Sequence, residues 1–209
     1  YEKNTSIALE EGYGIQLSVN SIKLLNEIGF KKLHNNEKFT PKKINFYSSS
    51  NLNKICELNI ENFNTQDCRY TTLKRSILIN FLKRDLEDLI KTGYKISKID
   101  EQDKHIELSF ENEETKEYDY LIISDGVFSK SKSLISNNKA KPKYNNTLAI
   151  RGVLTEFPEN IDNKNISLFL GSDSHHVIYP LNSNGDLNFI AITKYHLSEE
   201  EEKNYSLFG

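Results

Sequence analysis

The sequence predicts an α/β protein in two parts. Up to about residue 147, helical patterns alternate with short strand patterns, and from residue 148 onward one strand pattern follows another. A stretch rich in Asn, Lys and Pro at 136–147 separates the two parts and is typical of a linker. The length of 209 residues fits one large domain or two small ones. We therefore expect a mixed α/β part over 1–147 and the start of a β-sheet domain over 148–209.

The first elements are a helix and a hairpin. Leu17, Ile22, Leu25 and Ile28 recur at helical spacing, and Gly29 follows as a C-terminal stop. KINFYSS and KICELNI are two short strand patterns around a Ser- and Asn-rich turn, so a hairpin is expected at about 43–60.

A long amphipathic helix and three strands complete the first part. The helix carries one apolar stripe from Ile77 to Ile90 and is expected to end at Gly93. The strands are YKISKID, HIELSF and EYDYLIISD. The first two alternate as half-buried strands do, whereas the third contains a continuous apolar run at 120–123 that suits a strand covered on both faces. That run ends at Asp125-Gly126, and a short polar helix is expected over 129–135.

The second part contains four strand patterns. They are LAIRGVLTEF, ISLFL, HHVIYPL and LNFIAITKY, with turn residues between them. An antiparallel sheet is the expected arrangement.

Composition and charge exclude several classes of function. The 27 basic and 30 acidic residues leave a net charge of −3, too balanced for a nucleic-acid groove or an anionic membrane surface. No apolar run approaches the ~20 residues of a membrane span, and no secretory leader is visible. Cys56 and Cys68 form no C-x-x-C pair, which favours a reducing compartment. We expect a cytoplasmic protein, and the first residue, Tyr1, suggests a piece of a longer chain.

Metal and serine-hydrolase sites are not expected. His175 and His176 are neighbours in a predicted strand, so their rings point to opposite faces and cannot bind one metal ion together. Ser129 and Ser131 lie in no G-x-S-x-G motif. The spacing of these residues by itself supports no description more specific than a soluble α/β protein.

Four separated segments resemble, in order, the landmarks of the FAD-dependent aromatic-ring hydroxylases, the group A flavoprotein monooxygenases, and above all their salicylate-hydroxylase-like branch. They are YEKNTSIALEEGYGIQLSVNSIKLLNEIGF, LKRSILINFLKRDL, YDYLIISDGVFSKSK, and LAIRGVLTEF with the strands after it. The resemblance implies a Rossmann-like FAD-binding domain over 1–147 and the start of a substrate-binding β-sheet domain over 148–209. It also implies that the G-x-G-x-x-G and second FAD motifs lie outside this chain.

The resemblance assigns five residues to the cofactor. Glu2 falls where the family binds the adenosine ribose, and Gly14 falls in the glycine-containing loop. Arg75 matches the arginine that approaches the flavin nucleotide, where a guanidinium neutralises phosphate charge. Asp125 would hold the ribityl and pyrophosphate part of FAD, and Gly126 would permit close backbone approach.

The D-G segment departs from the family pattern. Ile123-Ser124 replaces a common Gly-Ala pair, and Lys132 stands where the family has an arginine, so a bidentate contact would be lost. Asp125-Gly126 itself is intact.

The substrate side is less defined. Arg151 would support the sheet or the flavin edge, and His176, Tyr179 and Phe189 would form the wall of an aromatic pocket. His176 and Tyr179 are also the candidates for a base that takes a phenolic proton.

The resemblance implies a monooxygenase reaction for the whole enzyme. NAD(P)H reduces FAD, O₂ adds to the flavin as a hydroperoxide, and one oxygen atom is transferred to a small phenolic or aromatic-acid substrate. The piece itself is expected to be inactive, and a homodimer is left open. Two alternatives stay open: a ubiquinone-pathway ring hydroxylase of the same group, and a nucleotide-binding module without catalysis.

Overall fold

The computed structural model describes residues 1–7, 9, 13–135, 142–157 and 161–204. It contains two compact units, each described by itself below. The first unit comprises Tyr1–Ala8, Leu86–Asn146 and His196–Gly209, and the second comprises Leu9–Asp85 and Thr147–Tyr195. The boundary at 146/147 lies beside the expected division, but residues 9–85 group with the later strands and not with the rest of 1–147.

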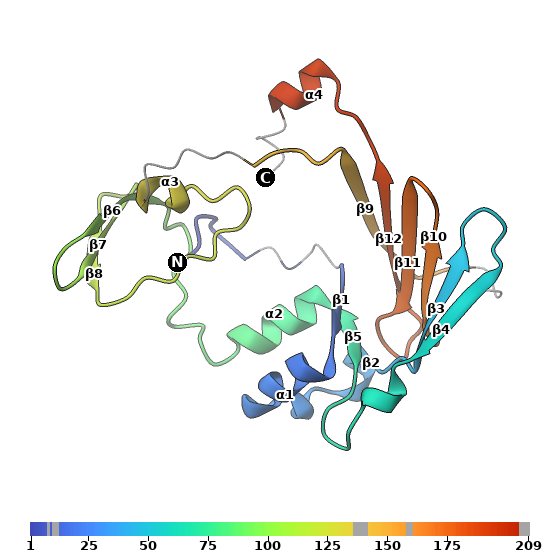
Figure 1. Cartoon of the computed structure of the whole chain (residues 1–209). Helices are drawn as coiled ribbons and strands as arrows, with labels where there is room; N and C mark the ends of the chain where they lie inside the picture. Colours follow the sequence, from blue (N-terminus) through green and yellow to red (C-terminus); the bar gives the residue numbers. More distant parts are fainter. Residues whose placement is uncertain (8, 10–12, 136–141, 158–160, 205–209) are drawn as a thin grey trace. The chain divides into compact units, whose positions relative to one another are not determined.

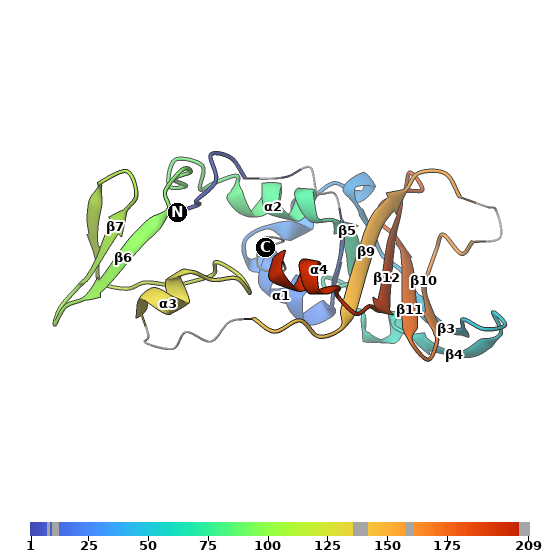
Figure 2. The same cartoon turned by 90° about the horizontal axis from the view of Figure 1, so that it is seen from above.

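The second unit is built on a six-stranded sheet, whose strands run side by side in Figure 1 and in Figure 2. Every pairing is antiparallel except that of β3 with β10, which is parallel. The four strands predicted after residue 147 are confirmed. In spatial order the strands are β4 (Lys54–Asn59), β3 (Lys43–Ser48), β10 (Ile166–Leu170), β11 (Ser174–Pro180), β12 (Leu187–Lys194) and β9 (Thr147–Leu154).

The hairpin predicted at 43–60 is confirmed as β3 and β4, with a bulge between Phe46 and Tyr47. Its membership of the large sheet was not predicted. Ile44 in β3 lies opposite Ile166 in β10, more than a hundred residues away along the chain. This long-range pairing explains why 9–85 and 147–195 form one unit.

A small sheet and two helices complete the second unit. The sheet has the order β1 (Gly14–Leu17), β5 (Thr71–Lys74), β2 (Lys38–Phe39). Helix α1 (Val19–Glu27) ends before Gly29, whose φ of 92° confirms it as the helix stop. Leu17, expected inside the helix, is instead the last residue of β1. Short 3₁₀ turns lie at Phe30–Lys32, Asn35–Glu37 and Glu61–Phe63, and the core is formed by Ile22, Phe30, Leu73 and Phe81.

The long helix predicted up to Gly93 is wrong in length. Helix α2 spans Arg75–Lys83. The next residue, Arg84, donates to the carbonyl oxygen of Ile28 at 3.0 Å and lies over the ring of Phe81. The chain leaves the second unit after Asp85, so the apolar stripe no longer meets the same core, and Leu89 is 73% exposed.

The first unit holds a three-stranded antiparallel sheet. Its order is β6 (Ile96–Glu101), β7 (Ile106–Phe110), β8 (Thr115–Tyr118), and Leu108 and Phe110 in the central strand are buried. Helix α3 (Ser131–Ile135) confirms the predicted short helix with a later start, and α4 (Glu199–Asn204) follows the last strand of the chain.

The third strand, predicted over EYDYLIISD, agrees with the structure only at Glu117 and Tyr118, the end of β8, and is wrong over 120–123. Those residues form no strand in the described part of the chain, and Tyr120 and Ile122 are 89% and 90% exposed. A continuous apolar run indicates a buried strand only where neighbouring strands and helices cover both faces. No described strand pairs with this run.

Candidate functional site

The first unit contains a cavity of about 300 Å³. Both carboxylates that the resemblance assigns to the cofactor, Glu2 and Asp125, line it, although they lie far apart in the sequence. Leu108, Ile123 and Phe128 add apolar surface to the same wall. Lys3, Lys95 and Lys130 also belong to the lining, so the cavity combines apolar surface with acidic and basic side chains.

Glu2 is held by its backbone. Its N–H donates to the carbonyl oxygen of Lys91 at 2.8 Å, and its own carbonyl oxygen accepts from Tyr94 at 2.9 Å. A single parallel bridge pairs it with Thr92. One carboxylate oxygen accepts from the N–H of Asn4 at 2.8 Å, which leaves the second oxygen available to a ligand hydroxyl.

Asp125 is oriented by the start of α3. Its Oδ2 accepts from the N–H of Ser131 at 3.1 Å. Burial by itself would raise the pKa of this carboxyl, but the Ser129 hydroxyl and the Ser131 N–H lower it below its ordinary value. Gly126 follows with a φ of 85°, a conformation that favours glycine, and its carbonyl oxygen accepts from Ser129 at 3.1 Å. Asp125 is thus a charged acceptor at neutral pH.

An aromatic cluster borders this cavity. Tyr1 and Tyr94 belong to its lining, and the ring of Tyr1 packs against Phe110 at 4.8 Å. The hydroxyls of Tyr1 and Tyr118 share a short contact, and this contact, with burial, raises the pKa of Tyr1 to about 12. The cluster was not predicted, because its members are separated by up to 117 residues.

Arg75 and Gly14 belong to the second unit, and neither lines this cavity. Arg75 is the first residue of α2, and its N–H donates to the carbonyl oxygen of Tyr13 at 2.7 Å. A Cβ on Gly14 would lie 2.7 Å from both Leu181 Cδ2 and Tyr179 Oη, so the site accepts only glycine without a shift. Gly14 was predicted in a loop, but it is the first residue of β1 and pairs with Lys74, so the structure gives it a packing reason and not a loop position.

Tyr179 is a buried phenol. It is 1% exposed, and burial raises its pKa well above the ordinary value, against smaller opposite effects of Arg151 and Gln16. Gln16 also accepts from the hydroxyl of Tyr70 at 2.7 Å. A phenol held protonated in this way is a hydrogen-bond donor at neutral pH and a poor base.

The four substrate-side candidates divide between the two faces of the large sheet. His176 lies opposite Ala191 and Tyr179 lies opposite Asn188, so alternation sends His176 and Phe189 to one face and Tyr179 to the other. His176 and Phe189 stack at 6.2 Å, and His176 Nε2 lies 3.5 Å from the Ser174 hydroxyl. Arg151 shares the face of Tyr179 by its register, and its guanidinium lies 5.8 Å from the ring centre of Tyr13. One face therefore cannot present all four.

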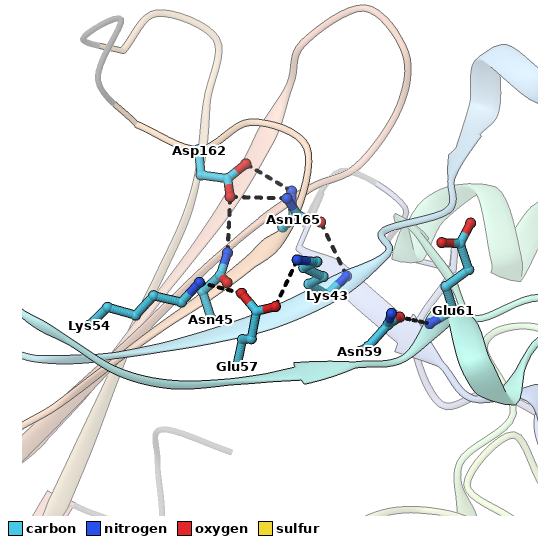
Figure 3. A network of polar contacts seen from close by, with 8 residues as sticks. All are labelled: Lys43, Asn45, Lys54, Glu57, Asn59, Glu61, Asp162 and Asn165. Carbon is cyan, nitrogen blue, oxygen red and sulfur yellow. Dashed lines mark hydrogen bonds and ion pairs between the residues drawn. The ribbon is translucent and has the colours of Figure 1, made fainter.

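A polar network that sequence reasoning missed joins β3, β4 and the start of β10 (Figure 3). Asp162 accepts from the side chain of Asn45 at 3.1 Å and from both the backbone and the side chain of Asn165 at 3.0 and 3.1 Å. Glu57 lies between Lys43 and Lys54 and pairs with both, which lowers the pKa of Glu57 to about 2. No local motif reveals these contacts, since they join residues up to 122 apart. The network fixes the parallel register of β3 on β10.

Three further features concern metal ligands, cysteines and membrane-spanning helices in the described part of the chain. Among the residues that the structure describes, no three His, Cys, Asp or Glu side chains are grouped as metal ligands. Cys56 and Cys68 are free thiols. None of the described helices is both long and apolar enough to cross a membrane.

Comparison with known proteins identifies the fold. The sequence matches no protein-family model and no curated protein. Among solved structures, HpxO from Klebsiella pneumoniae complexed with FAD and uric acid has a TM-score of 0.79 at 16% identity, over 95% of this chain and 50% of that one. The 2,6-dihydroxypyridine-3-hydroxylase from Arthrobacter nicotinovorans has a TM-score of 0.75 at 16% identity, over 95% and 50%. A salicylate hydroxylase in a substrate complex has a TM-score of 0.72 at 16% identity, over 89% and 49%.

The chain spans about half the length of these solved structures. At such identities the likeness concerns the fold, and these neighbours are FAD-dependent aromatic hydroxylases. The resemblance stated from the sequence is therefore confirmed for the fold: the chain has a mixed α/β fold that matches about half of these FAD-binding aromatic hydroxylases.

Proposed function

We propose that this chain is part of an FAD-dependent monooxygenase that hydroxylates a small aromatic substrate with NAD(P)H and O₂. The observation that carries the proposal is the cavity of the first unit, where Glu2 and Asp125 share one lining within a fold typical of flavin hydroxylases. When bound, FAD supplies the redox chemistry and the activation of O₂. This chain's own residues bind the cofactor, orient it and exclude water.

The cavity fits one part of the cofactor. Its volume of about 300 Å³ is at the lower end of small-molecule sites, which suits a nucleoside and not a whole dinucleotide. The free oxygen of Glu2 accepts from a ribose hydroxyl, as an acidic side chain does at the end of a Rossmann strand. Asp125, charged at neutral pH and followed by Gly126, offers a second acceptor to sugar hydroxyls.

Arg75 is proposed to neutralise phosphate charge of FAD. Its position at the first turn of α2 and its permanent positive charge support this role. Arg151 is proposed on the substrate side, because its side chain is exposed. Tyr179 shares its face of the sheet but lies in the core, so it is proposed to support that side and not to touch the substrate. His176 and Phe189 lie on the other face, so a pocket wall made by them would belong to a different surface.

Flavin binding tests the cofactor residues. In the full-length protein, Glu2→Gln and Asp125→Asn should each raise the dissociation constant for FAD about ten- to a hundredfold, the effect expected of a lost charge-assisted hydrogen bond. Fluorescence titration measures the constant. Glu101→Gln, an exposed carboxylate of β6 outside the cavity lining, is the matched control and should leave it unchanged.

Arg75→Ala should weaken flavin retention, with Lys23→Ala on the exposed side of α1 as its control. Unchanged retention in Arg75→Ala would remove the proposed role of this arginine.

Turnover tests the reaction class. The full-length protein should be yellow, and its oxidation of NADH or NADPH should be faster when the correct aromatic is added. A panel of phenolic acids and quinone precursors separates a small-aromatic hydroxylase from a ubiquinone-pathway enzyme. Flavin-loaded protein that no aromatic stimulates would defeat the hydroxylase proposal, and protein that never binds flavin would favour a nucleotide-binding module of another kind.

The proposed enzyme belongs to the cytoplasm. The two free thiols fit a reducing compartment. A homodimer is left to measurement by light scattering.

A further inference from the structure

Asn188 is a fully buried side chain in β12 that reaches a different sheet. It is 0% exposed, and its Oδ1 accepts from the N–H of Gly14 at 2.6 Å. Its Nδ2 is buried without a hydrogen-bond partner in the described part of the chain. Burying a polar group costs free energy unless the group is hydrogen-bonded. The hydrogen bond that Asn188 Oδ1 accepts therefore accounts for an asparagine at this position.

The bonded N–H belongs to a peptide group that is held at both ends. The carbonyl oxygen of Tyr13, in the same peptide unit, accepts from the backbone N–H of Arg75 at 2.7 Å. A peptide unit is planar and rigid. Fixing the N–H of Gly14 therefore also fixes the oxygen that receives the first N–H of α2.

Packing leaves this peptide little room to move. An added Cβ on Gly14 would lie 2.8 Å from Asn188 Cβ and 2.7 Å from Leu181 Cδ2. An ion pair lies one residue before α2, between Lys74 Nζ and Asp186 Oδ2 at 2.7 Å. The start of α2 is thus attached to the β11–β12 turn region by an ion pair and by the Asn188 relay.

We propose that Asn188 is a positioning residue: through the Tyr13–Gly14 peptide group it holds the backbone of Arg75 at the start of α2. The consequence for the cofactor rests on the proposed function, since a fixed Arg75 presents its guanidinium to the phosphates in one place. Asn188 itself touches neither substrate nor cofactor in this role.

Three variants of the full-length protein test the relay. Asn188→Leu keeps the volume and removes the acceptor. Asn188→Asp keeps an acceptor oxygen in either protonation state and should rescue the relay. Asn45→Leu is the matched control, because Asn45 is a buried asparagine of the same sheet that also has one bonded and one unpartnered polar atom.

Native-state amide exchange is the direct readout. In Asn188→Leu the amides of Gly14 and Arg75 should exchange on the order of tenfold faster than in the parent. The Gly14 N–H loses its acceptor, and the Tyr13 oxygen that accepts from Arg75 is no longer held in place. In Asn188→Asp their exchange should return toward the parent rate, and in Asn45→Leu it should not change. Equal acceleration at these two amides in Asn45→Leu, or none in Asn188→Leu, would overturn the proposal.

A failure of Asn188→Leu to fold does not remove the test. In the parent protein the Gly14 and Arg75 amides should be protected and should respond to denaturant together, because one peptide unit joins them. Exchange of the Gly14 amide at the rate of an open loop would overturn the relay.

Flavin titration separates this inference from the proposed function. If Asn188→Leu weakens FAD binding about tenfold and Asn188→Asp restores it, the relay serves the cofactor. If the parent protein binds no flavin, the proposed function fails, while amide exchange still decides whether Asn188 holds Arg75.

Discussion

The two compact units differ in which polar and apolar side chains they bury. In the second unit, buried Asn45 and Ser167 lie in the same sheet as buried Ile166 and Tyr179. In the first unit, large apolar side chains at Tyr120 and Ile122 are almost fully exposed. The local sequence around both sets predicts strands. The difference shows that burial depends on partners that are distant in the sequence, and not on the run itself.

The largest effect is expected from the core of the second unit. Leu181 is fully buried beside Tyr179 and Ile60, so Leu181→Ala should destabilise the protein by about 2–5 kcal/mol through lost transfer energy and a cavity. Chemical denaturation measures the change. A cost below about 1 kcal/mol would mean that this core is not packed as described.

The next effect concerns the polar network of Figure 3. Asp162→Ala removes the acceptor of Asn45, which is only 5% exposed, and should cost about 1–3 kcal/mol because a buried donor is left unpaired. Asp103→Ala, an exposed carboxylate in the first unit, is the control. Equal stability of the two variants would show that the network does not hold β3 on β10.

A smaller, pH-dependent effect is expected at Glu57. Its pKa is lowered from 4.5 to about 2 by Lys43 and Lys54, so its carboxylate stabilises the folded state fully above about pH 4.5. This contribution is lost as pH falls toward 2, where the folded-state carboxyl also becomes protonated. Thermal unfolding of Glu57→Gln should therefore differ from the parent at pH 7 and converge with it near pH 2. A constant difference across that range would contradict the ion pairs.

The smallest effect is expected at Ile122. Because its side chain is 90% exposed, Ile122→Ser should change the stability of the 209-residue chain by less than about 0.5 kcal/mol. Denaturation with Leu108→Ala, a buried site of the same unit, as the positive control measures this. A loss comparable to that of Leu108→Ala would mean that the apolar run at 120–123 is buried after all.

Local patterns predicted the elements that depend on neighbours in the chain. Gly29 ends α1 because its positive φ suits glycine, and the β3–β4 hairpin forms around its polar turn. Apolar sequence patterns gave wrong predictions where an element needs a packing partner that is distant in the sequence. The stripe beyond Lys83 and the run at 120–123 have the composition of buried elements, but no described strand pairs with the run, and only Leu121 and Ile123 in it are half-buried, at the lining of the cavity.

The residues of the candidate site also divide into those that the sequence predicted and those that only the structure revealed. Glu2 and Asp125 were found by their likeness to family motifs, and the structure adds that they share one cavity. Asn188 and Asp162 carry no motif, so nothing in the sequence marks them. His176 and Tyr179 were grouped as one pocket wall, although their spacing of three residues in one strand already puts them on opposite faces by alternation. The pairing of β11 with β12 is consistent with this division.

The sequence by itself determined the α/β class, the position of most strands, the stop at Gly29 and the likeness to flavin hydroxylases, because these follow from short-range periodicity and local residue types. Only the tertiary structure decided which segments form one unit, which sheet face each candidate residue occupies, and that one peptide group connects Asn188 to Arg75. The composition of the units and the Asn188 contact depend on pairs of residues more than a hundred positions apart. The relative faces of candidates on different strands depend on a register in which a shift of one residue reverses the face.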